Sequence, residues 1–305
     1  MLRIATRKSQ LALWQAEHVA SLLRSAHSGL VVELVPMSTK GDLILDRSLA
    51  AIGGKGLFIK ELETAMEEGR AEIAVHSMKD VPAELPPGFV IGAVLERADA
   101  RDALLATRYS DIGELPLGAV IGTSSLRRQA QLLALRPDVR IEALRGNVGT
   151  RLKRLDDGGL DAIVLACAGL VRLGLESRIT AYLDPGVSLP AVGQGVIGVE
   201  CRGNDAATLS LLAALEHPAT RTEIRAERAF SGRLGGSCQS PIAAHARLAN
   251  GSLTLDGLVA EPDGSRLLRD RISGSATDPD ALGEALAQRI LCAGAESLLE
   301  RLRAD

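Results

Sequence analysis

Strand-like and helix-like segments alternate through the first two thirds of the chain, and this alternation limits the fold more than any other feature of the sequence. Apolar runs typical of buried strands are separated by amphipathic runs with helical spacing. The pattern predicts strands at 2–5, 30–35, 71–75 and 89–95, with helices running to about residue 25 and over 57–69. The order β-α-β-α-β predicts a mostly parallel sheet with helices on its faces.

The same alternation begins again near residue 119, which predicts a second α/β unit of similar size. Its strands are expected at 119–121, 139–144 and 161–165, and its helices at 124–135 and 147–155. One more apolar strand, at 196–200, follows a Pro- and Gly-rich crossing. This late strand indicates that the chain returns to the first unit.

The last third has a different pattern, typical of a small α+β domain. The dipeptide Asn250-Gly251 joins two strand-like runs and predicts a hairpin. Strands are expected at 242–249, 252–259 and 266–272, and helices at 218–232 and 279–303. We therefore expect α/β domain 1 at 1–95 and 196–217, α/β domain 2 at 96–195, and an α+β domain at 218–305.

Composition argues against two classes of function. The 305 residues contain 35 Lys and Arg against 38 Asp and Glu, so the net charge is −3, whereas a general nucleic-acid binder needs a basic surface. Aromatic residues are only 2%, too few for base-stacking platforms. No apolar run approaches the ~20 residues of a membrane span, so no membrane partner is expected.

The N-terminus and the cysteines point to a cytoplasmic protein. Arg3, Arg7 and Lys8 stand where a signal peptide would be apolar, so no export signal is expected. The 4 cysteines are scattered and form no C-x-x-C, which indicates neither a zinc site nor a disulfide framework. A reducing compartment is the natural setting for such a chain.

A turn between the strand at 119–121 and the following helix gathers hydroxyl groups and cations. Thr123, Ser124 and Ser125 are followed at once by Arg127 and Arg128. Exposed N–H groups, hydroxyls and guanidiniums at such a turn are typical of an anion site. A capped helix with two solvated arginines explains the same residues about equally well.

Similar polar turns follow other predicted strands. Arg7 and Ser9 follow the first strand, and Arg145 follows the strand at 139–144, with Arg151 further along the next helix. In a parallel α/β sheet such turns lie together at the carboxyl ends of the strands, where ligands bind. Several arginines on one edge indicate a ligand with several carboxylates or phosphates.

Two further residues are candidates for chemistry. Asp80 follows the strand at 71–75, where a carboxylate among cations stays ionised and can bind an N–H or stabilise a cationic intermediate. Pairing with Lys79 or capping of the turn is the more frequent role of such an Asp, and His76 is interpreted as structural. Cys238 stands on a Gly-rich loop that favours an exposed, nucleophilic thiol, although free cysteines are more often buried.

Two glycine-rich segments resemble nucleotide motifs without meeting their requirements. Residues 193–198 fit G-x-G-x-x-G but precede a strand and open no helix. Residues 53–56 lack the spacing of a phosphate loop and instead suit a flexible lid that carries Lys55. A nucleotide-dependent enzyme is therefore not expected.

Ordered sequence blocks across nearly the whole chain resemble the porphobilinogen deaminase family, also called hydroxymethylbilane synthases. The blocks are I-A-T-R-K-S-Q-L-A-L-W-Q, G-G-K-G-L-F, H-S-M-K-D-V-P, G-T-S-S-L-R-R-Q, L-R-G-N-V-G-T-R-L, G-L-E-S-R-I, L-P-A-V-G-Q-G and E-R-A-F…G-G-S-C-Q-S-P-I. The resemblance implies two lobes like those of a periplasmic binding protein, and a third domain that carries a cofactor cysteine.

The resemblance also implies the reaction. Such enzymes condense four porphobilinogen molecules into a linear tetrapyrrole with loss of ammonia, starting from a dipyrromethane cofactor. By matching motifs, Cys238 attaches that cofactor through a thioether and Asp80 is the catalytic carboxylate. The matched motifs that bind cofactor and substrate include Arg7, Ser9, Lys55, Ser77, Lys79, Thr123, Ser124, Ser125, Arg127, Arg128, Arg145, Arg151, Arg172 and Gln194. A cytoplasmic monomer is expected, and neither metal nor nucleotide is required.

Physical chemistry agrees with this interpretation, because each pyrrole carries an acetate and a propionate that arginines can bind. Three positions depart from the family pattern. Many relatives have Lys where Ala51 stands, which leaves the role of the lid open, and Ser237 and Ser240 replace other residues beside the cysteine. The alternative function is a non-catalytic, two-lobed anion-binding protein; Cys238 and Asp80 together favour the enzyme.

Overall fold

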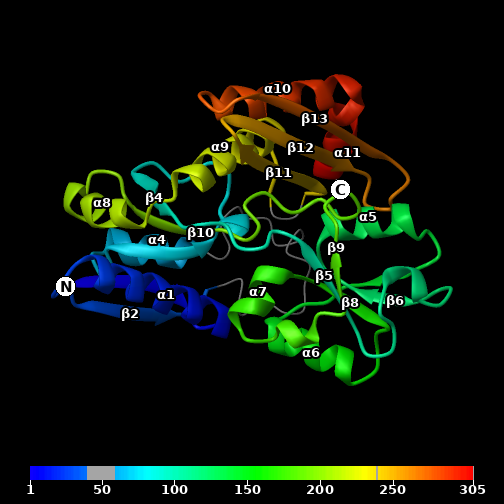
Figure 1. Ribbon diagram of the computed structural model, residues 1–305, viewed down its shortest axis with the longest axis horizontal. Helices are drawn as coiled ribbons and strands as arrows, with labels where there is room; N and C mark the ends of the chain where they lie inside the picture. Colours follow the sequence, from blue (N-terminus) through cyan, green and yellow to red (C-terminus); the bar gives the residue numbers. More distant parts are fainter. Residues whose placement is uncertain (40–58, 238–239, 305) are drawn as a thin grey trace. The chain divides into compact units, whose positions relative to one another are not determined.

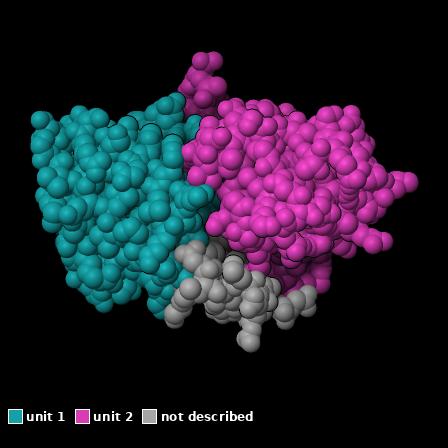
Figure 2. Space-filling view, turned by 90° about the horizontal axis from the view of Figure 1, so that it is seen from below, with its two compact units in different colours: residues 1–98, 196–221 teal, residues 99–195, 222–305 magenta. Residues whose placement is uncertain are grey.

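The computed structural model describes residues 1–39, 59–237 and 240–304 (Figure 1). The chain divides into two compact units, coloured separately in Figure 2: unit 1 comprises Met1–Ala98 and Val196–Arg221, and unit 2 comprises Asp99–Gly195 and Thr222–Asp305. Unit 2 takes in most of both the second and the third expected domains. The division into three domains therefore stays a prediction.

Unit 1 contains a five-stranded mixed sheet. Its strands, in spatial order, are β2 (Val32–Met37), β1 (Leu2–Arg7), β3 (Ile73–Ser77), β10 (Ile197–Arg202) and β4 (Phe89–Val94). β1 is parallel to β2 and β3, whereas β10 is antiparallel to β3 and β4. Four of these five strands run in one direction, so the expectation of a mostly parallel sheet is confirmed, and β10, the returning strand, runs in the opposite direction.

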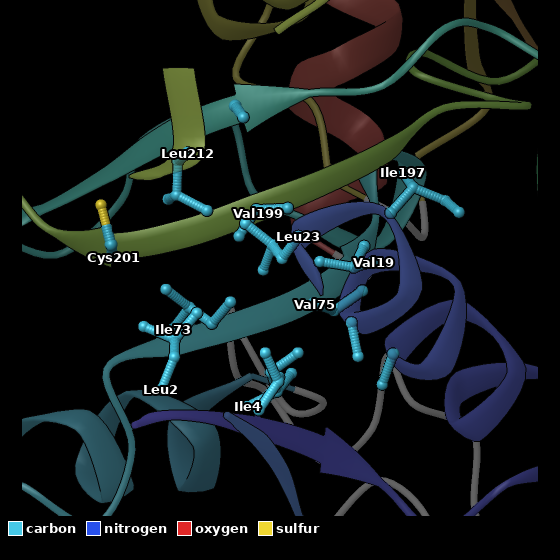
Figure 3. Close-up of a cluster of buried hydrophobic side chains, with 14 of the residues drawn as sticks. Leu2, Ile4, Val19, Leu23, Ile73, Val75, Ile197, Val199, Cys201 and Leu212 are labelled. Atoms are coloured by element: carbon cyan, nitrogen blue, oxygen red, sulfur yellow. The ribbon is translucent and has the colours of Figure 1, made fainter. Parts of the chain in front are cut away.

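Side chains of the strands in unit 1 point alternately to the two faces of the sheet, and a helix packs on each face. Val19 and Leu23 of α1 (Gln10–Ala26) pack in one apolar cluster with Ile4 and Ile73 (Figure 3). Ala5 and Ala74, the neighbours of those strand residues, belong instead to a cluster with Leu62 and Met66 of α4 (Lys60–Glu67). Since successive strand residues point to opposite faces, α1 and α4 cover opposite faces. Each fully buried Leu or Ile contributes roughly 1.5–3 kcal/mol.

The first sheet of unit 2 repeats the strand pattern of unit 1. Its order is β7 (Arg140–Glu142), β6 (Val120–Gly122), β8 (Ala162–Ala166), β5 (Asp102–Ala106) and β9 (Ala181–Leu183). β6 is parallel to β7 and β8, and β5 is antiparallel to β8 and β9. The accompanying helices are α5 (Leu126–Leu135), α6 (Val148–Asp156) and α7 (Cys167–Arg172).

The second sheet of unit 2 is an antiparallel meander of β11 (Ile242–Ala249), β12 (Ser252–Ala260) and β13 (Leu267–Ser275). Asn250 (φ 51°) and Gly251 (φ 76°) make the predicted hairpin turn. Phe230 of α9 (Pro218–Arg233) and Leu286 of α10 (Pro279–Ile290) share an apolar core with this sheet.

The single helix expected at 279–303 is wrong. A wide turn at Leu291–Ala295, with Gly294 at φ 104°, separates α10 from α11 (Glu296–Ala304). The fold class is nevertheless confirmed as two α/β sheets with a small α+β unit. In the described parts of the chain, no helix is long and apolar enough to cross a membrane.

Candidate active site

A small cavity in unit 1 collects the polar residues at the ends of two parallel strands. Arg7 and Ser9 come from the turn between β1 and α1, and Ser77 and Asp80 come from the turn after β3. Gln15 of α1 donates from Nε2 to Ser77 Oγ at 2.8 Å and so fixes this hydroxyl. One cation, two hydroxyls and one carboxylate therefore line one cavity, as expected for parallel strands whose carboxyl ends meet.

Local hydrogen bonds hold the two turns of this cavity. Ser9 is the N-cap of α1 and accepts from the Ala12 N–H at 3.3 Å. Asp80 ends a single 3-10 turn, η1 (Met78–Asp80), whose first N–H donates to the Val196 carbonyl at 2.9 Å. Lys79 lies on the same turn but is not among the lining residues. The site can bind an anion beside Arg7 and accept N–H groups at Asp80.

In unit 2 the hydroxyls after β6 serve the local backbone. Ser125 is the N-cap of α5 and accepts from the Arg128 N–H at 3.4 Å. Thr123 Oγ1 accepts from the Ser125 N–H at 3.2 Å, and Ser124 Oγ donates to the Leu144 carbonyl at 2.9 Å. The capped-helix interpretation of this turn describes these contacts. Each hydroxyl still has acceptor capacity left over.

The capped-helix interpretation expected Arg127 and Arg128 to be solvated. Instead, both guanidiniums are buried around one carboxylate. Arg127 Nη1 lies 2.8 Å from Asp102 Oδ2, and Arg128 Nη2 lies 2.7 Å from Asp102 Oδ1. The same guanidiniums donate to the Leu189 carbonyl at 2.6 Å and to the Val164 carbonyl at 3.0 Å. These contacts do not favour the prediction that the two arginines bind substrate directly.

Asp102 is the centre of this buried cluster. Ser188 Oγ and Gln194 Nε2 also donate to it, at 2.8 Å and 2.9 Å. Burial alone would raise the pKa of Asp102, but the charges of Arg127 and Arg128 outweigh burial and hold that pKa far below its usual range. The sequence analysis missed Asp102. One sequence signal could have indicated it: Asp102 stands at the start of an apolar run, where a buried carboxylate needs a cationic partner such as Arg127 or Arg128.

The remaining candidate arginines of unit 2, Arg145, Arg151 and Arg172, follow β7 and β8. Asn147 caps α6, and Arg151 Nε donates to the Gly146 carbonyl at 2.9 Å, while Arg145 is half-buried in the same turn. Arg172, at the end of α7, donates to the Gly195 carbonyl at 2.7 Å, and burial lowers its pKa to about 10. Because β6 is parallel to β7 and β8, their carboxyl ends form one edge of the sheet.

Three positions of interest lie outside the described residues: Ala51, Lys55 and Cys238. Beside the cysteine, the two unusual serines contact each other. Ser240 Oγ accepts from the Ser237 N–H at 3.1 Å, and the two hydroxyls lie 3.2 Å apart. The two departures from the family pattern therefore form one hydrogen-bonded pair.

The fold and these side chains define a class: a protein with two α/β sheets whose strand ends carry guanidinium, hydroxyl and carboxylate groups. Family models identify the member of that class. The model of the porphobilinogen deaminase dipyromethane cofactor binding domain matches residues 2–210, and that of the porphobilinogen deaminase C-terminal domain matches residues 221–292. The chain belongs to the porphobilinogen deaminase family.

The predicted reaction and cofactor are thereby confirmed. The chain is an enzyme, a hydroxymethylbilane synthase, that polymerises porphobilinogen into a linear tetrapyrrole on a dipyrromethane cofactor. Both matched families consist of enzyme domains, so the alternative of a non-catalytic binding protein is not supported.

The similarity of this chain to solved structures is weaker than its match to the family models. A nutrient binding protein from Burkholderia cenocepacia bound to methionine is 12% identical, with a TM-score of 0.45 over 72% of this chain and 92% of that chain. A periplasmic substrate-binding protein of an ABC transporter from Coxiella burnetii is 16% identical, with a TM-score of 0.46 over 73% of this chain and 94% of that chain. Scores of this size carry no conclusion about function.

Proposed function

We propose that the cavity at the ends of β1 and β3 holds the reacting pyrrole and that Asp80 is the catalytic carboxylate. The observation that carries this proposal is the convergence of Asp80, Arg7, Ser9 and Ser77 on one cavity. A pyrrole ring offers an N–H donor and acidic side chains, and these match a carboxylate acceptor beside a guanidinium and two hydroxyls.

Asp80 acts on the charge that develops as ammonia leaves. The departing amine takes the electron pair of its C–N bond, which leaves positive charge spread over the pyrrole ring and its N–H. A carboxylate already held at the end of η1 accepts that N–H and stabilises the charge without reorganising. Arg7 binds an acetate or propionate of the same molecule, while Ser9 and Ser77 fix its orientation.

In unit 2, we assign the binding of further carboxylates to Arg145, Arg151 and Arg172, with the hydroxyls of Thr123, Ser124 and Ser125 beside them. Their positions at the ends of three neighbouring strands support this assignment. The sequence also predicts binding by Arg127, Arg128 and Gln194. Because all three contact Asp102, we propose instead that they hold the turn of Thr123–Ser125 in place.

The donor groups of both units suit the cofactor. Guanidiniums and hydroxyls match the acidic side chains of a dipyrromethane, and Asp80 matches its N–H groups. When bound, the dipyrromethane supplies the covalent anchor and the nucleophilic pyrrole carbon for chain growth. We propose that Cys238 holds it through a thioether and that Lys55 and Lys79 add positive charge around the growing acid.

Asp80→Asn tests the central assignment, because it removes the charge and keeps the shape. We expect turnover to fall roughly 10²–10³-fold while the thermal unfolding midpoint stays unchanged. Asp157→Asn is the control, since Asp157 is an exposed partner of Lys153. Turnover near the wild-type value in Asp80→Asn would remove Asp80 from the reaction.

We also propose that the enzyme works as a cytoplasmic monomer. Cys167 and Cys201 are buried free thiols, which suits a reducing compartment, and each chain carries both sets of donors. Sedimentation equilibrium tests the oligomeric state. A mass of two chains at micromolar concentration would contradict the monomer.

A further inference from the structure

A buried group of three ionisable residues lies behind the cavity of unit 1. His76 of β3 and Glu200 of β10 approach to 2.8 Å between Nε2 and Oε2, with side-chain exposures of 4% and 0%. Glu63 of α4 is 7% exposed. In the register of β3 and β10, Glu200 pairs with Ala74, which packs in the α4 cluster. His76, Glu200 and Glu63 therefore share the face of the sheet that α4 covers.

This cluster is costly for the fold. His76 Nε2, both carboxylate oxygens of Glu200 and Oε1 of Glu63 are buried, and within the described residues none has an aligned hydrogen bond. Burying such groups without full pairing costs free energy, and apolar residues of similar size usually serve stability at least as well. A contribution to stability therefore does not explain why three ionisable groups stand here.

Burial and the charges around Glu63 bring the pKa of its carboxyl close to neutral pH. Burial, and after it the negative charge of Glu200, raises the pKa of Glu63 to about 7, with a smaller effect of Glu67. His76 and Lys60 act in the opposite direction. A proton lost by Glu63 therefore adds a negative charge to a cluster that already contains Glu200.

The cluster is joined to the catalytic turn by covalent and packing contacts. His76 lines the cavity with Asp80 and directly precedes Ser77. On β10, a Cβ at Gly198 would lie 2.2 Å from Met78 Sδ, so the start of η1 rests directly on this strand. A change in how β3 and β10 sit at this end therefore reaches Asp80.

We propose that His76, Glu200 and Glu63 form a buried proton-holding unit that positions the Ser77–Asp80 turn for catalysis. With the Glu63 carboxyl protonated, the buried His76–Glu200 pair has no second carboxylate charge beside it and the end of β3 stays in place. When that proton leaves to solvent, a second buried carboxylate repels Glu200 and the turn loses its fixed geometry. The three are proposed as positioning residues: Glu63 and Glu200 are not among the residues that line the cavity, and His76, which lines it, acts here through its contact with Glu200.

Glu63→Gln tests the proposal, because it mimics the protonated glutamate. We expect kcat of the wild type to fall as pH rises through about 7 and this step to disappear in Glu63→Gln, with KM within about twofold throughout. The matched control is Glu68→Gln on the exposed C-terminal end of α4, where Glu68 pairs with Arg70, and its profile should follow the wild type.

The second readout is the ring NMR signal of His76, assigned with His76→Gln. In the wild type it should shift with the same midpoint as kcat, and in Glu63→Gln that step should be absent. Superimposable pH profiles of wild type and Glu63→Gln, or a pH dependence of the His76 NMR signal that Glu63→Gln leaves unchanged, would overturn the proposal. The kcat readout rests on Asp80 as catalytic carboxylate, whereas the NMR readout does not. If the assignment of Asp80 alone fails, the pH dependence of the His76 NMR signal still tests the cluster.

Discussion

Arg127 donates from Nη1 to Asp102 at 2.8 Å in the interior of unit 2, and the two side chains are 4% and 0% exposed. Arg128 binds the other carboxylate oxygen, so one aspartate holds two adjacent guanidiniums. Residues on β5 and at the start of α5 are thereby fixed to each other. The Arg-Arg pair that the sequence predicts at a ligand site is bound, in the fold, to a buried aspartate, and its role in binding stays a prediction.

Removing the charge of Asp102 should destabilise the protein strongly. Asp102→Asn leaves two buried guanidiniums without their anion, and breaking a buried pair in this way costs about 3–5 kcal/mol. Urea denaturation measures the change in the free energy of unfolding. Asp157→Asn, which breaks the exposed pair with Lys153, should cost about 0.5 kcal/mol or less. Equal losses in the two variants would contradict the role given to Asp102.

Acid should weaken the contribution of Asp102. Its pKa is lowered in the folded state, so below pH ~4 the unfolded chain binds a proton that the native carboxylate does not. The stabilisation is therefore complete above the unfolded pKa and is lost as pH falls toward the native value. The difference in unfolding free energy between wild type and Asp102→Asn should shrink from pH 6 to pH 3. A difference independent of pH in that range would refute the linkage.

Local signals account for much of the fold and for part of the site. Asn147 caps a predicted helix, and Asn250-Gly251 turns a predicted hairpin, because both depend on neighbouring residues alone. The convergence of Arg7, Ser9 and Asp80 also follows from strand order, since parallel strands end at one edge.

Tertiary partners account for what the sequence did not reveal. The sequence predicts Arg127 and Arg128 as ligand-binding or solvated residues, because Asp102, which lies 25 residues before Arg127, is on a strand that was not predicted. The π-type turn at Leu291–Ala295 interrupts an amphipathic pattern that continues on both sides, so periodicity alone predicts one helix. For the two arginines, the deciding contact lies outside any local sequence window.

Glu63 should make the protein less stable as pH rises. The folded-state pKa is raised to about 7 from an ordinary value near 4.5, so the native state binds the extra proton between these values. The stabilisation is complete below pH ~4.5 and is lost through pH ~7, at up to roughly 1.4 kcal/mol per pH unit. Glu63→Gln should flatten the stability profile from pH 5 to 7.5 in urea denaturation, and Glu68→Gln should not. A wild-type profile unchanged by Glu63→Gln would show that Glu63 titrates normally.

Filling the space at Gly198 should disturb both catalysis and stability. A Cβ there would lie 2.2 Å from Met78 Sδ, and the Met78 side chain must move, which shifts the turn that carries Asp80. We expect Gly198→Ala to lower kcat roughly 10-fold or more and to cost about 1–3 kcal/mol in unfolding free energy. Gly159→Ala is the control, because no atom lies within 4 Å of a Cβ at that position. Unchanged kcat in Gly198→Ala would show that Met78 adapts without moving Asp80.

If the cofactor is attached covalently at Cys238, the intact protein should be heavier than the unmodified polypeptide. Purified wild-type protein should exceed its sequence mass by two linked pyrroles, because a thioether survives denaturation, and intact-protein mass spectrometry measures this excess. Cys238→Ser should show the bare mass and no turnover. Cys292→Ser, at the exposed cysteine beyond α10, should keep both the added mass and the activity. An active wild type with the bare mass, or added mass that persists in Cys238→Ser, would place the attachment elsewhere.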